Sequence, residues 1–249
     1  MAFRTIQIDE RPGGVGIIIL SRPEKRNAIS IEMRRELCDC LGNWRDRGSI
    51  GAVVLTGAGA VFSAGFDLSE FKKPALFGEL YETSAKYHRD IWYFPKPIIA
   101  AVNGPALAGG FDLAKLCDLR ICSQTASFGH PEIKFGVPPL MTPLRWIVGE
   151  GLARDICMTG RIVKSDEAHR IGLVSGIFPE GTLLDRALQI ALEILEAPRP
   201  ALGFLKRNML DHASRGFEDS FCIEHDKAFQ EFLLKKASEF IAGGGASGG

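Results

Sequence analysis

The chain has 249 residues, and its 30 Lys and Arg balance 30 Asp and Glu, so the formal net charge is zero. Hydrophobic residues make up 46% and charged residues 24%, which excludes a disordered chain and allows a substantial core. The neutral balance argues against a nucleic-acid partner, because nucleic-acid-binding proteins usually carry a basic surplus or stripe.

The sequence lacks the usual signals for a membrane helix, for export and for a metal site. No apolar run reaches the roughly 18 residues that a membrane-spanning helix needs. The first residues, MAFRTIQIDE, are typical of neither a signal peptide nor a transit peptide. The cysteines and histidines form no pair with zinc or redox spacing. We therefore expect a cytoplasmic protein that binds no metal and does not interact with a membrane.

The first half of the chain alternates short apolar runs with helical patterns. The runs are rich in β-branched residues and bounded by Gly, Pro or Asp, so we predict buried strands over Val15–Leu20, Ala52–Thr56, Pro97–Val102 and Asp118–Cys122. After the first strand, apolar residues recur at helical spacing up to Trp44, and Ser30 is the expected N-cap. A second helix is predicted over about Leu80–Phe94, before Pro95.

The second half is mainly helical. Short helices are expected over Thr142–Val148, Leu152–Met158 and Asp166–Ile171, the last of them capped by Ser165. A strand is expected over Leu173–Phe178. Further helices are expected over Leu183–Leu195, about Leu202–His212 and about Phe217–Phe240.

Strands followed by helices predict an α/β core with a helical C-terminal region. We expect the core over residues 1–195 and the helical region over 196–242. Residues 243–249, with the sequence GGGASGG, have the composition of a flexible linker.

Three segments rich in small residues each follow a predicted strand. They are Ser21–Ser30, Thr56–Leu68 and Asn103–Leu116. Small residues let the backbone approach a ligand closely and leave amide N–H groups free to donate. Two such loops that converge on one point would form an oxyanion hole.

The glycines match none of three better-known motifs. Phe62 stands where the third glycine of a dinucleotide-binding fingerprint belongs, and there is no P-loop sequence. A nucleophile elbow at Ser63 would need a glycine in place of Val61. The sequence therefore argues against hydride transfer, phosphoryl transfer and serine hydrolysis.

Four segments, RPEKRNAIS, FSAGFDL, NGPALAGGFDLA and SFGHPEIKFGVPP, resemble the enoyl-CoA hydratase/isomerase (crotonase) superfamily in order and spacing, as does DEAHRIGLVSGIF farther along. The resemblance covers about Val15–Phe178. It implies a spiral of ββα turns and a helical trimerisation region, hence a homotrimer or a dimer of trimers. It also implies an acyl-CoA thioester substrate, so that coenzyme A arrives with the substrate and no separate cofactor is needed.

The family stabilises a thioester enolate with two backbone N–H groups. By position, the resemblance assigns this role to Phe66 and Gly109, and Ala108 stands where the family usually has glycine. The coenzyme A moiety would pass the following residues: Lys25, Arg26, Ala28, Ala64, Asp67 and Leu68.

Two carboxylates decide which reaction the resemblance implies. Hydratases of the family place two acids twenty residues apart, and here these positions hold Asp112 and Glu132. By this resemblance Asp112 would hold and deprotonate water, and Glu132 would protonate the α-carbon. Leu140 stands where a glycine amide normally helps to hold the water, so its side chain is expected to reshape the acyl pocket.

Two alternatives to a hydratase stay open. A Δ3,Δ2-enoyl-CoA isomerase needs only the second acid, which Glu132 supplies. A non-catalytic relative would keep the fold and the coenzyme A pocket as a binding module, but it would have no need for two paired carboxylates.

Overall fold

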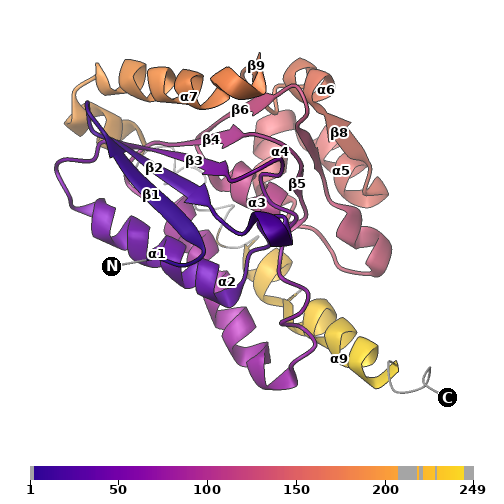
Figure 1. Cartoon of the computed structure of the whole chain (residues 1–249). Coiled ribbons are helices and arrows are strands. Elements are labelled where there is room, and N and C mark those ends of the chain that lie inside the picture. Colours follow the sequence, from indigo (N-terminus) through magenta and orange to yellow (C-terminus); the bar gives the residue numbers. More distant parts are fainter. Residues whose placement is uncertain (1–2, 207–217, 219–220, 228, 244–249) are drawn as a thin grey trace.

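The computed structural model describes residues 3–206, 218, 221–227 and 229–243, and every structural statement below concerns these residues (Figure 1). A larger sheet has the strand order β1-β2-β3-β4-β6-β9 and a smaller sheet has the order β5-β7-β8. The larger sheet consists of β1 Ile6–Arg11, β2 Val15–Leu20, β3 Ala52–Gly57, β4 Ile98–Val102, β6 Leu119–Ser123 and β9 Ile177–Phe178. The smaller consists of β5 Ala106–Leu107, β7 Ser127–Gly129 and β8 Ile162–Lys164.

The central strands β2, β3 and β4 are buried on both faces, which explains why they are continuous apolar runs. Strands β2, β3, β4, β6 and β9 pair in parallel, and β1 pairs antiparallel with β2. Successive side chains of a strand point to opposite faces. In β3, Val53 and Leu55 therefore enter one core while Ala52 and Val54 enter another.

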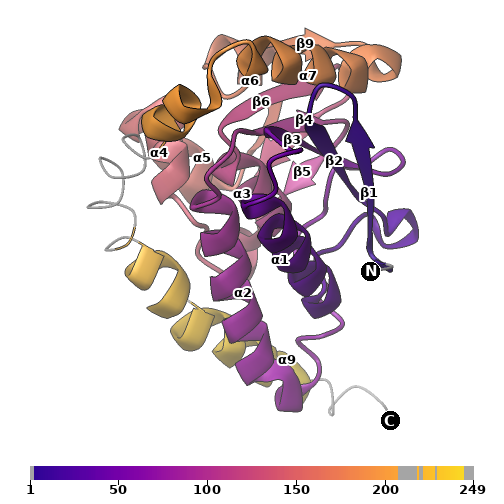
Figure 2. The same ribbon diagram turned by 90° about the vertical axis from the view of Figure 1, so that its left-hand side faces the viewer.

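Helices cover the two faces of this sheet (Figures 1 and 2). On one face lie α1 (Ile31–Arg45) and α2 (Phe77–Trp92), which pack against each other and close the main core. On the other face α7 (Glu180–Leu195) crosses β3, β4 and β6 and buries Leu183, Ala187 and Ala191. The α/β class expected from the sequence is confirmed.

The remaining described helices lie between and beyond the sheets. They are α3 (Gly109–Leu116), α4 (Thr142–Val148), α5 (Glu150–Thr159), α6 (Ser165–Arg170), α9 (Leu234–Gly243), a helical stretch over residues 199–206 and short 3-10 turns at Pro23–Lys25, Pro74–Leu76 and Pro131–Phe135. Two π-helical segments, Cys222–Lys227 and Phe229–Leu233, lead into α9. Among the described helices, none is both long and apolar enough to cross a membrane.

Most predicted elements are present, with shifts of a few residues at their ends. Ser30 caps α1 as expected, because its side chain accepts a hydrogen bond from the Met33 amide. The expected helix over Leu202–His212 is helical as far as residue 206, and residues 207–217 lie outside the described part. The tail expected over 243–249 lies outside it except for Gly243.

Two expectations are wrong. Ser165 does not cap α6 but is its first residue, and its hydroxyl instead donates to the Gln124 carbonyl. The strand expected over Leu173–Phe178 is limited to Ile177–Phe178, because the amides of Leu173 and Val174 donate to the Ala168 carbonyl and close the end of α6.

Candidate active site

The segments that follow β2, β3 and β4 leave the same edge of the sheet, because these strands are parallel. Asn27 joins the first two segments. Its side chain is fully buried, and its amide nitrogen donates to the carbonyls of Ala58 (2.9 Å) and Val61 (2.6 Å). The hydroxyl of Ser63 donates to the Asn27 carbonyl at 2.8 Å. Asn27 thus holds the second segment (Thr56–Leu68) against the first (Ser21–Ser30).

The second and third segments approach each other too closely for most side chains. Ser63 forms an isolated parallel bridge with Ala106. A Cβ placed on Gly110 would lie only 2.3 Å from the Ser63 carbonyl oxygen, and one on Gly65 would lie 3.2 Å from the Gly109 nitrogen. Glycine at these positions lets two backbones meet.

This contact brings two unused amides into one region. The N–H groups of Phe66 and Gly109 donate no hydrogen bond to any residue that the structure describes. Gly109 is the first residue of α3, where the N–H groups of a helix have no partner within the helix and the helix dipole is positive. Both amides therefore lack an acceptor within the described residues, and a ligand oxygen in this region could accept from both.

Ala108, in the third segment directly before Gly109, has a strained backbone. Its φ is 50° and its ψ is −126°, a conformation that glycine adopts far more readily than alanine. The glycine usual at this family position is thus explained by the backbone. The chain retains the conformation despite the added methyl group.

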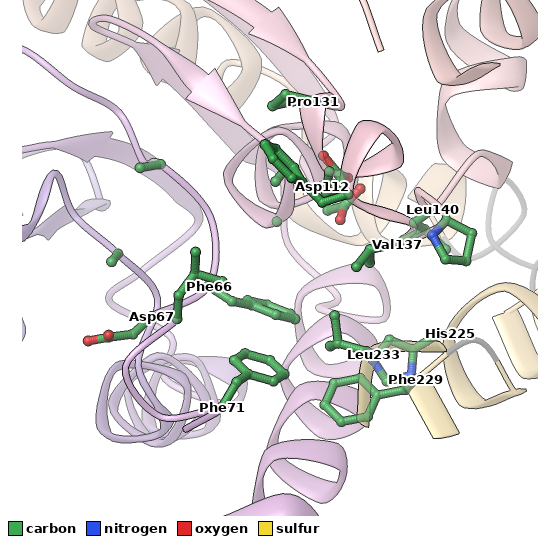
Figure 3. A pocket seen from close by; sticks show the side chains of 18 of the residues that line it. Phe66, Asp67, Phe71, Asp112, Pro131, Val137, Leu140, His225, Phe229 and Leu233 are labelled. Carbon is green, nitrogen blue, oxygen red and sulfur yellow. The ribbon is translucent and has the colours of Figure 1, made fainter. Parts of the chain in front are cut away.

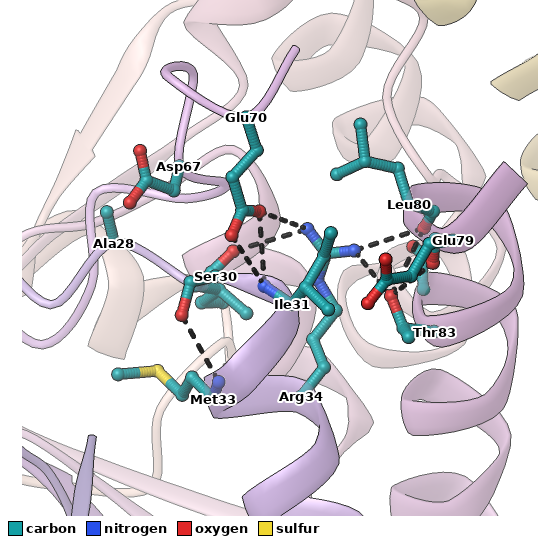
Figure 4. Close-up of polar contacts among 12 residues, drawn as sticks. Ala28, Ser30, Ile31, Met33, Arg34, Asp67, Glu70, Glu79, Leu80 and Thr83 are labelled. Carbon is teal, nitrogen blue, oxygen red and sulfur yellow. Dashed lines mark hydrogen bonds and ion pairs between the residues drawn. The ribbon is translucent and has the colours of Figure 1, made fainter. Parts of the chain in front are cut away.

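The Phe66 loop is held in place by a buried arginine that the sequence analysis did not single out (Figure 4). The guanidinium of Arg34 on α1 lies 4.5 Å from the centre of the Phe66 ring and donates to the Leu80 carbonyl and the Thr83 hydroxyl. Glu70, from the same loop as Phe66, accepts the Ile31 amide at the start of α1. The loop is therefore fixed from both sides.

The segments surround a cavity of about 540 Å³ (Figure 3). Ten of the eleven residues assigned from the sequence line it: Lys25, Ala28, Ala64, Phe66, Asp67, Leu68, Gly109, Asp112, Glu132 and Leu140. Arg26 does not. It ends the first 3-10 turn in a left-handed conformation, and its carbonyl accepts the Ala64 amide, so its backbone helps to shape the loop.

Two of the residues assigned to coenzyme A are arranged in ways that the sequence did not indicate. The Asp67 carboxylate pairs with Arg22 at 2.8 Å and points away from the Phe66 ring (Figure 3). It also accepts bonds from the Ser69 amide and hydroxyl, so it stabilises the turn after Phe66. Leu68 is 73% exposed at the rim.

Asp112 lies on α3 and is largely buried. Its Oδ1 lies 2.8 Å from the ammonium nitrogen of Lys115, one turn along the helix, and 3.8 Å from Nε2 of His130. The contact with Lys115 is an ion pair without hydrogen-bond directionality, since Oδ1 has no hydrogen-bond partner among the described residues. A buried carboxylate is thus compensated by a buried cation.

Glu132 lies on the 3-10 turn after β7. Its Oε1 is 2.8 Å from Nδ1 of His130, whereas Oε2 is buried and has no hydrogen-bond partner within the described chain. Burial raises the pKa of Glu132 to about 7. A carboxyl group with such a pKa can both hold and release a proton near neutral pH.

His130 remains neutral at physiological pH. Its ring is fully buried, and burial together with the nearby Lys115 ammonium lowers its pKa to about 3. The carboxylates of Asp112 and Glu132 are therefore linked through the uncharged ring of His130 and the ammonium group of Lys115.

Part of the cavity wall comes from the C-terminal segment, which was not expected from the sequence. His225, Phe229 and Leu233 line the cavity opposite Phe66, and the Phe71 ring lies 6.3 Å from both the Phe66 and the Phe229 rings (Figure 3). Helical spacing 225, 229 and 233 marks one face of a helix, but nothing in the sequence says against which surface it packs.

Comparisons with known proteins show which family the chain resembles in sequence. The sequence pattern of the family described as Enoyl-CoA hydratase/isomerase matches residues 10–239. A protein of Thermus thermophilus named as an enoyl-CoA hydratase is 37% identical over 224 residues, which cover 87% of either chain.

Solved structures show the same fold. An enoyl-CoA hydratase/isomerase from Xanthobacter autotrophicus Py2 has a TM-score of 0.83 and 30% identity, covering 95% of this chain and 89% of that one. A monofunctional enoyl-CoA isomerase from Mycobacterium smegmatis has a TM-score of 0.71 and 32% identity, covering 85% and 94%. The crotonase-type α/β fold, the family sequence pattern and the spacing of the two acids agree, and the chain belongs to the enoyl-CoA hydratase/isomerase family.

Proposed function

We propose that the protein is an enoyl-CoA hydratase, which reversibly adds water across the 2,3 double bond of an enoyl-CoA thioester. The observation that carries this proposal is the presence of Asp112 and Glu132 in one cavity with the two unused amides of Phe66 and Gly109. Hydration needs all three features: a base for water, an acid for C2 and donors for the enolate oxygen.

In the proposed reaction the thioester oxygen accepts hydrogen bonds from the Phe66 and Gly109 amides. Asp112 takes a proton from water, and the hydroxide adds to C3 while the electrons of the double bond move to the thioester oxygen. Glu132 then gives its Oε2 proton to C2. Water has been added across the bond, and exchange with solvent returns the proton from Asp112 to Glu132.

Apolar side chains line the cavity beside Asp112 and Glu132, where the acyl chain would bind. Phe66, Phe71, Phe229 and Leu140 present apolar surface, as expected for a pocket that binds the hydrocarbon part of a ligand. Lys25 at the mouth is a candidate partner for the coenzyme A phosphates, and we propose that Ala28, Ala64 and Leu68 contact the rest of that moiety.

The second candidate is a Δ3,Δ2-enoyl-CoA isomerase. It is favoured by the Asp112–Lys115 ion pair, which compensates Asp112 within the protein, and by the likeness to the Mycobacterium smegmatis isomerase. In that reaction Glu132 alone would move a proton between C2 and C4. A homotrimer or dimer of trimers is our proposal for the assembly, on the family resemblance.

Turnover of a short trans-2-enoyl-CoA tests the proposal, with loss of the conjugated thioester absorbance as the signal. We expect turnover by the wild type and a loss of at least about 100-fold in both Glu132→Gln and Asp112→Asn. Formation of that absorbance from a 3-enoyl-CoA, abolished by Glu132→Gln and retained by Asp112→Asn, would instead identify the isomerase. Binding of the substrate without either reaction would identify a non-catalytic relative.

A further inference from the structure

Lys115 is a fully buried lysine on α3, and the proposed reaction gives it no role. Its side chain is 0% exposed, and its ammonium group lies close to three polar atoms. These are Oδ1 of Asp112 and Nε2 of His130, each at 2.8 Å, and the carbonyl oxygen of Leu140 at 2.5 Å. Burying an ammonium group is costly unless it is paired, and Lys115 has two hydrogen-bond acceptors and one carboxylate in an ion pair.

These contacts fix the tautomer of His130. An ammonium group has three donors and no acceptor, so Nε2 of His130 must be unprotonated where Lys115 meets it. The ring proton of a neutral imidazole then sits on Nδ1, which lies 2.8 Å from Oε1 of Glu132. His130 therefore donates to Glu132, and Oε1 is the accepting oxygen.

We propose that Lys115 and His130 are positioning residues for Glu132. Lys115 sets the tautomer of His130, and His130 holds Oε1 so that Oε2 carries the proton delivered to the substrate. Oε2 is buried and has no hydrogen-bond partner among the described residues, as this role requires. That the proton goes to C2 of an enoyl group rests on the proposed function; the tautomer and the choice of oxygen do not.

The same lysine links both acids to the cavity wall. It reaches Asp112 on its own helix, His130 after β7, and the Leu140 carbonyl in the segment before α4. Tyr87 and His88 from α2 and His225 from the C-terminal segment also interact with this network, and Lys134 lies exposed on the Glu132 turn. Burial raises the pKa of Tyr87 and lowers those of His88 and His225, so all three are neutral near pH 7, and Lys115 is the buried cation in contact with Asp112 and His130.

The first test is the tautomer of His130 in the ligand-free protein, read from long-range ¹H–¹⁵N NMR spectra between pH 5.5 and 8. We expect a neutral ring protonated on Nδ1 throughout. In Lys115→Met the ring loses the donor to Nε2, and we expect a mixture of tautomers. A wild-type ring protonated on Nε2, or on both nitrogens at pH 7, would overturn the proposal. This measurement needs no turnover, so it stands apart from the proposed function.

The second test separates the two sides of the ring by substitution. In His130→Asn the amide nitrogen can take the place of Nδ1 and still donate to Glu132. In His130→Gln the amide instead lies near the place of Nε2 and faces Lys115. We expect His130→Gln to lower kcat by about 10- to 100-fold with KM little changed, because a misplacement of about 1 Å can cost about 100-fold, and we expect His130→Asn to recover most of it.

Lys115→Met is expected to lower kcat like His130→Gln. It should also move the titration of Glu132 above its starting pKa of about 7, because the Lys115 charge favours the ionised carboxylate. The matched control is Lys134→Met, which removes an exposed lysine from the Glu132 turn. It should change neither kcat nor the pKa of Glu132. Equal losses in His130→Asn and His130→Gln, or an unmoved Glu132 titration in Lys115→Met, would contradict the positioning role.

Discussion

Ala108 offers a stability test of the backbone geometry at the proposed oxyanion hole. Its φ of 50° with ψ of −126° costs an alanine about 1–3 kcal/mol, a strain that glycine does not have. Replacing Ala108 by glycine also makes the unfolded chain more flexible, which costs about 0.4–1 kcal/mol. The methyl group is only partly buried, so little apolar contact is lost. We therefore expect Ala108→Gly to stabilise the protein by about 1 kcal/mol, a rise in Tm of about 2–4 °C.

The matched control is the same chemical change six residues later. Ala114 is fully buried within α3, so Ala114→Gly loses a packed methyl group and places glycine inside a helix. These terms sum to a destabilisation of about 2 kcal/mol. Urea unfolding of the three proteins at one protein concentration measures both differences. Destabilisation of Ala108→Gly to the same extent as Ala114→Gly would refute the strain at residue 108.

Two further predictions concern stability. Glu132 has a pKa of about 7 in the folded protein, against the usual value of 4.5 expected in the unfolded chain. The unfolded chain therefore loses this proton at a lower pH than the folded protein does. The free energy of unfolding falls as the pH rises from about 4.5 to 7. In Glu132→Gln the free energy of unfolding should not show this fall, so its advantage over wild type should grow by about 3 kcal/mol between pH 5 and 8. In the exposed control Glu150→Gln the free energy of unfolding should follow that of wild type at every pH. A Glu132→Gln curve parallel to wild type would contradict the raised pKa. Asn27→Asp should cost about 2–4 kcal/mol, because a carboxylate cannot donate to the Ala58 and Val61 carbonyls. Unchanged urea stability in this variant would mean that Asn27 does not hold the two segments together.

Most of the larger sheet could be predicted because β2, β3 and β4 are buried on both faces and bounded by Gly, Pro or Asp. Strand β1 was missed because only Ile6 of its six residues is buried, so its sequence looks like a polar terminus. What holds its start is Glu36 on α1, which accepts the amides of Arg4, Thr5 and Ile6. A contact across some thirty residues leaves no local signal in the sequence.

The site was predictable where backbone geometry demands particular residues. Gly65 and Gly110 are required by close approach, and the resemblance then placed Asp112 and Glu132. The buried charges Arg34 and Lys115 were not predictable in this way. A lysine three residues after an aspartate on a helix is usually a solvated pair, and only the fold shows that this one is buried between Asp112, His130 and Leu140. The proposed domain division and trimer stay predictions.

The central claim is a division of labour: the Phe66 and Gly109 amides stabilise an enolate, Glu132 moves the proton at C2, and Asp112 handles only water. Exchange of the C2 protons of a saturated acyl-CoA in D₂O, followed by ¹H NMR, tests it most directly, because exchange needs the enolate and the proton carrier but no addition at C3. We expect exchange in the wild type and in Asp112→Asn, and none in Glu132→Gln. Exchange lost in Asp112→Asn, or retained in Glu132→Gln at the wild-type rate, would contradict the account.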